Sequence, residues 1–187
     1  MGCISKIHRP FLIFQKFMLN KNAKKIIDSC YEELESLGVL LIEAGNDTKS
    51  AYYLKKYAIL RAIGSIETAY RLILTDKLIK GQYTYAKNFI KKKVRDLTPD
   101  PKLATIRIVL GELDDRWLAR FNEQMTLHNA MRHIVGLTFL TDSRDAFSRG
   151  ENPDIPIETT VLYYKSVIEI MNILDEIVHY SYEKNPT

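Results

Sequence analysis

The sequence predicts an all-α protein, a single-domain bundle of five to six helices. Apolar residues recur every three or four positions along most of the chain, which is the period of an amphipathic helix. No segment keeps the apolar–polar alternation of a strand, and the interruptions are rich in Gly, Pro, Asn and Asp. The chain has 187 residues, of which 46% are hydrophobic, and its composition is even along its length. It is therefore long enough to bury one core and needs no second domain.

The first two predicted helices are long and end at glycines. The first covers residues 23–44 and stops at the turn that begins with Gly45. The second begins near Asp47 and Thr48, both suitable N-cap residues, and runs to about Lys80, with Gly81 as its stop. Each carries an apolar stripe on one face, so both are expected to line the core.

Shorter helices fill the rest of the chain. They are predicted by the same spacing and are separated by Gly, Pro or polar turns; their ranges are residues 84–94, 103–125, 127–147 and 157–182. The prolines at 99 and 101 prevent the first of these helices from continuing into the second.

The N-terminal residues 1–22 are predicted to form an extension or arm before the helical domain of residues 23–187. The first residues resemble a myristoylation signal, but Lys6 stands where Ser or Thr is required. The apolar run Phe11–Phe14 is too short for a signal-peptide core or a membrane span. We therefore expect neither export nor insertion into a membrane.

Charge and cysteine content set broad limits on partners and location. The net charge of +4 permits nucleic acid as a partner without requiring it. Cys3 and Cys30 fit neither a disulfide framework nor a metal-binding spacing. Free thiols and a cytoplasmic location are the expectation.

A motif ends the helix predicted over residues 127–147. It reads Arg144-Asp145-Ala146-Phe147-Ser148-Arg149-Gly150 and is followed by Glu-Asn-Pro-Asp-Ile-Pro-Ile and a tyrosine-bearing helix. The motif resembles the signature of the HEPN family of helical ribonucleases, in which Arg is followed by Asn, Asp or His, then a few mostly apolar residues, then His-Gly. The spacing is the same, with four residues between Arg144 and the position of the His, but that position holds Arg149.

The resemblance extends to about the last two-thirds of the chain. The second predicted helix carries Arg61, Ile63, Ile66 and Glu67, similar to the Arg, apolar, apolar, Glu pattern of the family. The likeness is greatest to the RiboL-PSP-HEPN-like branch, and it implies a HEPN-like helical bundle over residues 23–187.

The resemblance also implies an activity and partners. HEPN ribonucleases cleave RNA without a metal or other cofactor, and two protomers place their motifs in one cleft at a homodimer interface. They act as toxins or as abortive-infection effectors against phage, which implies an RNA substrate such as tRNA and an antitoxin or another protein partner. In this role Arg144 would hold the phosphate and Asp145 would orient the site.

Arg149 cannot replace the histidine in proton transfer. Its guanidinium stays protonated up to pH ~12, so it is neither a base nor a useful acid at neutral pH. Loss of general acid–base catalysis alone costs about 10²–10⁴-fold in rate. We therefore expect a HEPN-type endoribonuclease with little or no activity, in which Arg149 still binds phosphate.

Several explanations of Arg149 stay open. The first is an inactivating substitution in a toxic enzyme. The second is a natural feature of a protein that only binds RNA, nucleotide or a partner protein. The third is that another histidine takes over the role of the one that Arg149 replaces. A purely structural helical adaptor is a further alternative. The candidate substitutes are His128, His133 and His179, each of which is more simply a surface or hydrogen-bonded helix residue. Their spacing does not indicate a metal site.

Two more groups of residues are candidates. Glu67 lies among apolar neighbours and is predicted to pair with a cation, with Arg144 as the candidate; an exposed glutamate is the alternative. Lys91, Lys92 and Lys93 belong to a basic run with aromatic neighbours and are predicted to contact RNA. A solvated helix surface is the alternative explanation for that run.

Overall fold

The computed structural model consists of seven helices over the residues that it describes, which are 18–45, 48–98, 100–128, 130–151 and 153–179. They are α1 (Lys21–Ala44), α2 (Lys49–Leu78), α3 (Thr84–Leu97), α4 (Leu103–Leu113), α5 (Asp115–Leu127), α6 (Met131–Ser148) and α7 (Ile157–His179). These residues contain no strand, so the all-α prediction is confirmed, with seven helices in place of five or six. None of the described helices is long and apolar enough to cross a membrane.

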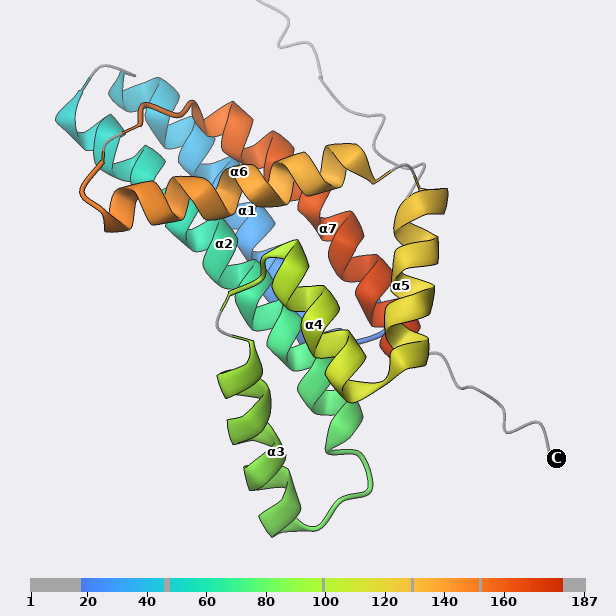
Figure 1. Cartoon of the computed structure of the whole chain (residues 1–187). Helices are drawn as coiled ribbons and strands as arrows, with labels where there is room; N and C mark the ends of the chain where they lie inside the picture. The colour runs from blue at the N-terminus through green and yellow to red at the C-terminus, as the bar shows by residue number, and fades with distance from the viewer. Residues whose placement is uncertain (1–17, 46–47, 99, 129, 152, 180–187) are drawn as a thin grey trace, which may run out of the picture.

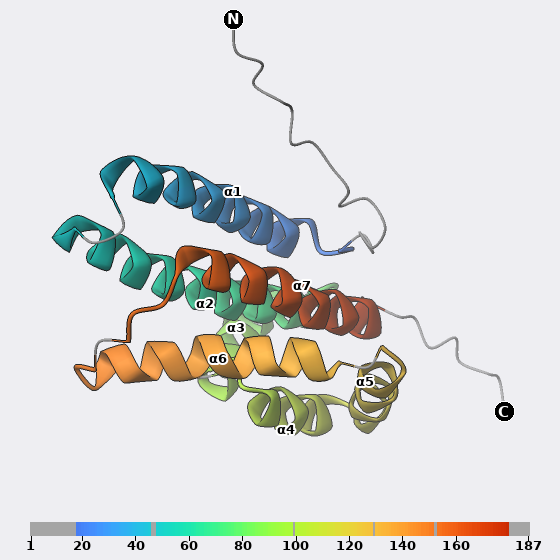
Figure 2. The same cartoon turned by 90° about the horizontal axis from the view of Figure 1, so that it is seen from above.

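Helices α2 and α7 lie in the middle of the bundle, with α1 on one side and α6 on the other (Figure 2). Tyr164 of α7 is fully buried where three helices meet. Its hydroxyl lies 2.8 Å from Ser65 Oγ of α2 and donates a hydrogen bond of 3.2 Å to the carbonyl of Ile27 on α1. Satisfying this buried hydroxyl fixes the relative positions of the three helices.

The start of α1 is attached to the end of α7. Asn20 caps α1, because its side-chain oxygen accepts a hydrogen bond of 2.9 Å from the N–H of Ala23. The backbone N–H groups of Leu19 and Asn20 both donate to the buried carboxylate of Asp175. The chain from residue 18 onward therefore packs into the bundle, and residues 1–17 of the predicted arm lie outside the described residues.

The prediction of a single helix over residues 103–125 is wrong, because two helices, α4 and α5, cover this range. The backbone leaves the helical conformation at Asp114, with φ −165° and ψ 114°, and the chain turns between α4 and α5 (Figure 1). The Asp114 side chain accepts a hydrogen bond of 2.9 Å from the N–H of Arg116 and so begins a new helix. The apolar spacing continues through this corner because both helices turn an apolar face toward the core.

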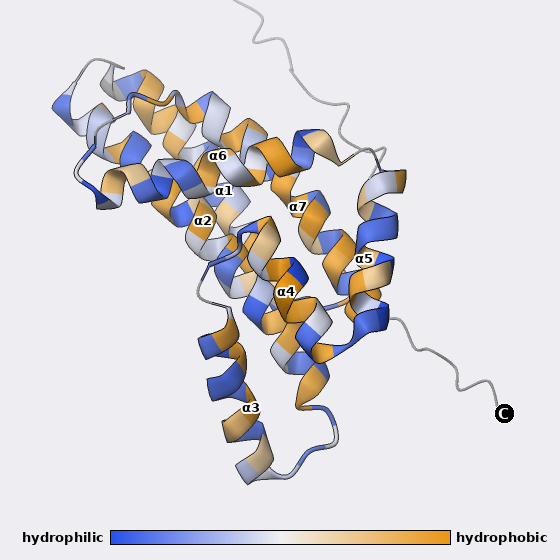
Figure 3. Ribbon diagram, in the orientation of Figure 1, coloured by the Kyte–Doolittle hydropathy of each residue, from blue (hydrophilic) through white to orange (hydrophobic). Residues whose placement is uncertain are grey.

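Helix α3 projects from the rest of the bundle (Figure 1) and packs chiefly against α2. Val94 is its buried residue, and Ile90 and Leu97 pack beside it against the main core. Hydrophilic and hydrophobic residues alternate in bands along this helix (Figure 3). The fold therefore uses one side of α3 and leaves the opposite side exposed.

Candidate functional site

The glycine of the motif has a structural role at the end of α6. Gly150 has φ +83°, a conformation that favours glycine. Its N–H donates to the carbonyl of Phe147 at 3.1 Å, and the N–H of Glu151 donates to the carbonyl of Ala146 at 3.0 Å. These two hydrogen bonds form a Schellman motif, which satisfies carbonyls that the end of the helix leaves free. Helix termination alone accounts for glycine at this position.

The segment after the motif is held against α2. Phe147, Ile155 and Ile59 form a small buried cluster that joins α6, the segment and α2. Lys55 Nζ lies 3.0 Å from a carboxylate oxygen of Asp154. The position of the motif relative to α2 is therefore fixed by apolar packing with an ion pair beside it.

Arg144, Asp145 and Lys102 form one ion-pair network. Arg144 Nε and Nη2 donate to Asp145 Oδ1 at 3.0 and 2.8 Å, and Lys102 Nζ donates to Asp145 Oδ2 at 3.0 Å. The Arg144 guanidinium and Lys102 both hold the pKa of Asp145 below its usual range, and the hydrogen bond to Asp145 raises the pKa of Lys102. Lys102 Nζ also lies 3.7 Å from Asp100 Oδ2, so the network contains two cations and two carboxylates, all of them partly exposed.

Arg149 lies apart from this network. Its side chain is 62% exposed, and Nε donates to Glu151 Oε1 at 2.8 Å. That hydrogen bond raises the pKa of Arg149, whose guanidinium is protonated at neutral pH even without it. Five helical positions separate Arg149 from Arg144, which is about 140° around the helix. The structure gives each arginine of the motif its own acidic partner.

The expected ion pair between Glu67 and Arg144 is not the one that forms. Glu67 Oε1 instead lies 3.4 Å from Arg71 Nη2, one turn later on α2. Arg71 also donates to Thr98, with 2.8 Å from Nη2 to the carbonyl oxygen. Arg61, the other charged residue of the α2 pattern, pairs with Glu33 of α1 at 2.6 Å. These α2 residues tie neighbouring segments to α2.

The three described histidines lie far from the end of α6. His133 is buried on the first turn of that helix, with Nδ1 3.0 Å from Ser166 Oγ, and burial lowers its pKa. It precedes Arg144 by 11 residues, about 16 Å along the axis. His179 ends α7 with Nδ1 2.9 Å from the carbonyl oxygen of Asp175, and His128 ends α5. Within the described residues, none of these histidines lies at the end of α6, where the resemblance implies one.

The predicted RNA-binding lysines lie on α3, away from the motif. Lys91, Lys92 and Lys93 are exposed, and Lys93 Nζ lies 5.8 Å from the centre of the exposed Phe89 ring. No described residue forms an ion pair with any of the three lysines. The motif and the basic run are therefore two separate surfaces.

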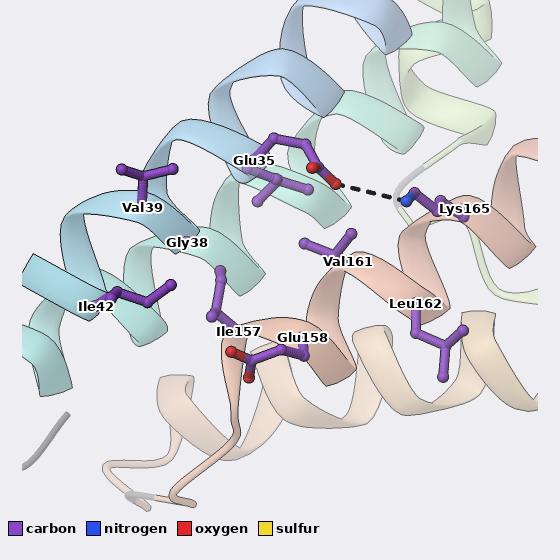
Figure 4. Close-up of a pocket in the computed structure, with 10 residues that line it drawn as sticks. Glu35, Gly38, Val39, Ile42, Ile157, Glu158, Val161, Leu162 and Lys165 are labelled. Carbon is purple, nitrogen blue, oxygen red and sulfur yellow. Dashed lines mark ion pairs between the residues drawn. The ribbon is translucent and has the colours of Figure 1, made fainter. Parts of the chain in front are cut away.

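An open groove of about 450 Å³ runs between α1 and α7 (Figure 4), and the sequence did not indicate it. Its lining is mostly apolar, with Val39, Ile42 and Leu162 strongly exposed, and an ion pair of 3.5 Å between Glu35 of α1 and Lys165 of α7 joins its two walls (Figure 4). The charged side chains of its lining are Glu35, Glu158 and Lys165. The described part of the chain contains no cluster of side chains that could hold a metal ion.

No family model, curated protein or solved structure matches the chain. The resemblance to HEPN ribonucleases therefore stays a prediction from the motif and its surroundings.

Proposed function

We propose that this chain is a HEPN-type metal-independent endoribonuclease whose cleavage is disabled by Arg149. The observation that supports this most is the Arg144–Asp145–Lys102 network at the end of α6. The carboxylate holds two donors of the Arg144 guanidinium in place, and Nη1 has no hydrogen-bond partner among the described residues. A fixed guanidinium with a free donor is suited to a phosphate oxygen.

Arg149 fits the second half of the proposal. RNA cleavage by the neighbouring 2′-hydroxyl needs a group that takes up and releases protons near neutral pH. Arg149 is exposed at the helix end, so a phosphate can reach it, but its guanidinium stays protonated at neutral pH. Arg149 would then bind the substrate without transferring a proton.

The experiment is to restore the histidine. The parent chain and the Arg149→His variant are incubated in EDTA with total tRNA and with a structured RNA. We expect cleavage by the variant about 10²–10⁴-fold above the parent, with a rate that depends on pH around the imidazole pKa near 6.5. The Arg149→Gln variant is the matched control, because it removes the guanidinium without adding an imidazole. The Arg144→Ala/Arg149→His double variant should be inactive.

A homodimer and a cellular role belong to the same proposal. Two copies would face their motifs across one cleft, and sedimentation equilibrium tests whether the chain forms a dimer. If the protein belongs to a toxin or antiphage system, induced expression of Arg149→His in bacteria should arrest growth, whereas the parent should not. A folded Arg149→His variant that binds RNA and never cleaves it contradicts the ribonuclease proposal.

A second candidate is a HEPN-like scaffold that binds RNA without cleaving it. The lysines of α3, which form no ion pair with a residue that the structure describes, favour this function, because they give the chain a cationic surface independent of the motif. The two candidates differ in one result, since only the first predicts that histidine at position 149 produces cleavage.

A further inference from the structure

Helix α3 accounts for the whole net charge of the chain. It contains five basic residues and one acidic residue, Asp96. Of the 27 basic and 23 acidic residues in the full sequence, this leaves 22 of each for the rest of the chain. The basic residues are Lys87, Lys91, Lys92, Lys93 and Arg95. The net positive charge is thus concentrated on one short helix that projects from the bundle (Figure 1).

These cations are not used to stabilise the fold. None of the five forms an ion pair with a residue that the structure describes, although Arg144, Lys102, Arg149 and Lys55 all do. Like charges crowded on one helix repel each other, so the arrangement costs stability unless an anion binds there.

Exposed aromatic rings lie on the same face as part of this charge. Tyr85, Phe89 and Lys93 follow at intervals of four residues and therefore form one stripe along the helix. Tyr85 is 76% exposed and Phe89 62% exposed. Tyr83, just before the helix, stacks on Tyr85 with ring centres 5.9 Å apart and planes within 4°. Lys92 flanks the stripe.

The rings are not an unfilled part of the core. The apolar side of α3, with Ile90, Val94 and Leu97, already packs against the protein. A membrane-binding helix needs a broad apolar face, and the exposed side of α3 offers Phe89 and two tyrosines. Flat rings beside cations are instead the combination that binds the bases and phosphates of a single strand.

The base of α3 is fixed. Arg71 holds the carbonyl and the hydroxyl of Thr98, the C-cap of α3, and Glu67 pairs with Arg71. The stripe is therefore presented on a rigid support, which reduces the entropy lost on binding.

We propose that residues 83–97 bind single-stranded RNA, with bases stacked on Tyr83, Tyr85 and Phe89 and phosphates at Lys92 and Lys93. Successive rings on α3 are about 6 Å apart along the helix. Bases in a duplex strand are spaced about 3.4 Å and cover each other's faces, so a duplex cannot use both platforms. The choice of RNA rests on the proposed function, which this inference extends by naming the substrate class.

The test measures binding by fluorescence anisotropy with a labelled unstructured RNA, the same RNA as a duplex, and a single-stranded DNA of the same sequence. The stacking variant is Tyr85→Ala/Phe89→Ala, and the charge variant is Lys92→Gln/Lys93→Gln. Their matched controls are Tyr53→Ala, which removes another exposed ring, and Lys21→Gln/Lys25→Gln, which removes two exposed lysines of α1. All four retain the buried residues, and circular dichroism checks that they fold.

We expect both α3 variants to bind the single-stranded RNA at least about tenfold more weakly, and both controls to bind like the parent. The parent should prefer the single strand to the duplex. Equal affinity of parent and α3 variants would overturn the proposal, as would equal loss in the controls. Binding to vesicles with anionic lipid but not to RNA would overturn it in favour of a membrane surface.

The result is separable from that of the ribonuclease test. Weaker binding by the α3 variants together with an inactive Arg149→His variant would support this inference and contradict the ribonuclease proposal. If the α3 substitutions change neither RNA binding nor the cleavage by Arg149→His, the ribonuclease proposal is supported and this inference is contradicted. If the parent binds the single-stranded DNA as tightly as the single-stranded RNA, the assignment of RNA as the ligand of α3 is overturned.

Discussion

Basic side chains gather both at the end of α6 and on α3, but the protein treats their charges differently. At the end of α6 each cation has an acidic partner: Arg144 and Lys102 share Asp145, and Arg149 pairs with Glu151. On α3 the five cations have no such partner among the described residues. A charge with an internal partner is explained in part by the fold, whereas an unpaired cluster is explained better by something outside the chain.

The largest expected difference between the two regions is the loss of stability when a phenylalanine of each is replaced by alanine. Phe147→Ala removes a buried ring from the cluster with Ile59 and Ile155 and should lower the free energy of unfolding by about 3–5 kcal/mol. Phe89→Ala removes an exposed ring from α3 and should change that free energy by at most about 0.5 kcal/mol. Urea denaturation of both variants measures the contrast. Similar losses would show that the Phe89 ring also contributes to the stabilising core.

Salt should separate the two surfaces next. Contacts of Lys92 and Lys93 with phosphates give a slope of about 1.4 for the logarithm of the affinity against the logarithm of salt, and the upper bound, with all five α3 cations in contact, is about 3.5. Between roughly 50 and 200 mM salt these slopes are losses of about sevenfold and about 100-fold. Lys92→Gln/Lys93→Gln should reduce the slope by about 1.4, and Arg144→Ala by no more than about 0.7. If Arg144→Ala reduced the slope more than the lysine variant does, the motif and not α3 would be the surface that binds the strand.

A smaller effect is expected at the end of α6. Gly150→Ala places a side chain at φ +83° and should cost about 1–2 kcal/mol of stability, although open space surrounds the position. Gly150→Asn should cost less, because asparagine tolerates this conformation. Thermal unfolding of the two variants compares them. Equal stability of Gly150→Ala and the parent would mean that the Schellman turn does not require glycine.

Much of the helical architecture was predictable from the sequence. The second helix, expected from about Thr48 to just before Gly81, is α2 (Lys49–Leu78). Its N-cap and its glycine stop act locally, so a local pattern is sufficient to place them. The break at Asp114 was missed because the apolar spacing continues through it. One polar residue inside the periodic segment, the N-cap Asp114, is what divides it into two helices.

The surroundings of the candidate residues were less predictable. Lys102 and Asp145 are 43 positions apart in the chain, so their ion pair depends on how α4 packs on α6. Glu67 was assigned to Arg144, but a partner one turn away on the same helix was closer. Sequence patterns locate charged residues on helix faces, whereas partners are set by packing between helices.

The smallest predicted effect uses pH to distinguish the paired region from the unpaired one. The Arg144 guanidinium and Lys102 lower the pKa of Asp145 in the folded chain. A lowered carboxyl pKa stabilises the fold above the ordinary carboxyl value of about 4, and that contribution is lost as pH falls through the folded pKa. Asp145→Asn should therefore be less stable than the parent by roughly 0.5–1 kcal/mol at neutral pH, and the difference should shrink toward zero below about pH 3. Lys92→Gln is the control on α3, since it breaks no ion pair with a described residue and should show no such dependence on pH. Urea denaturation across this range measures both variants, and a difference for Asp145→Asn that stays constant with pH would mean that the network adds nothing to stability through charge.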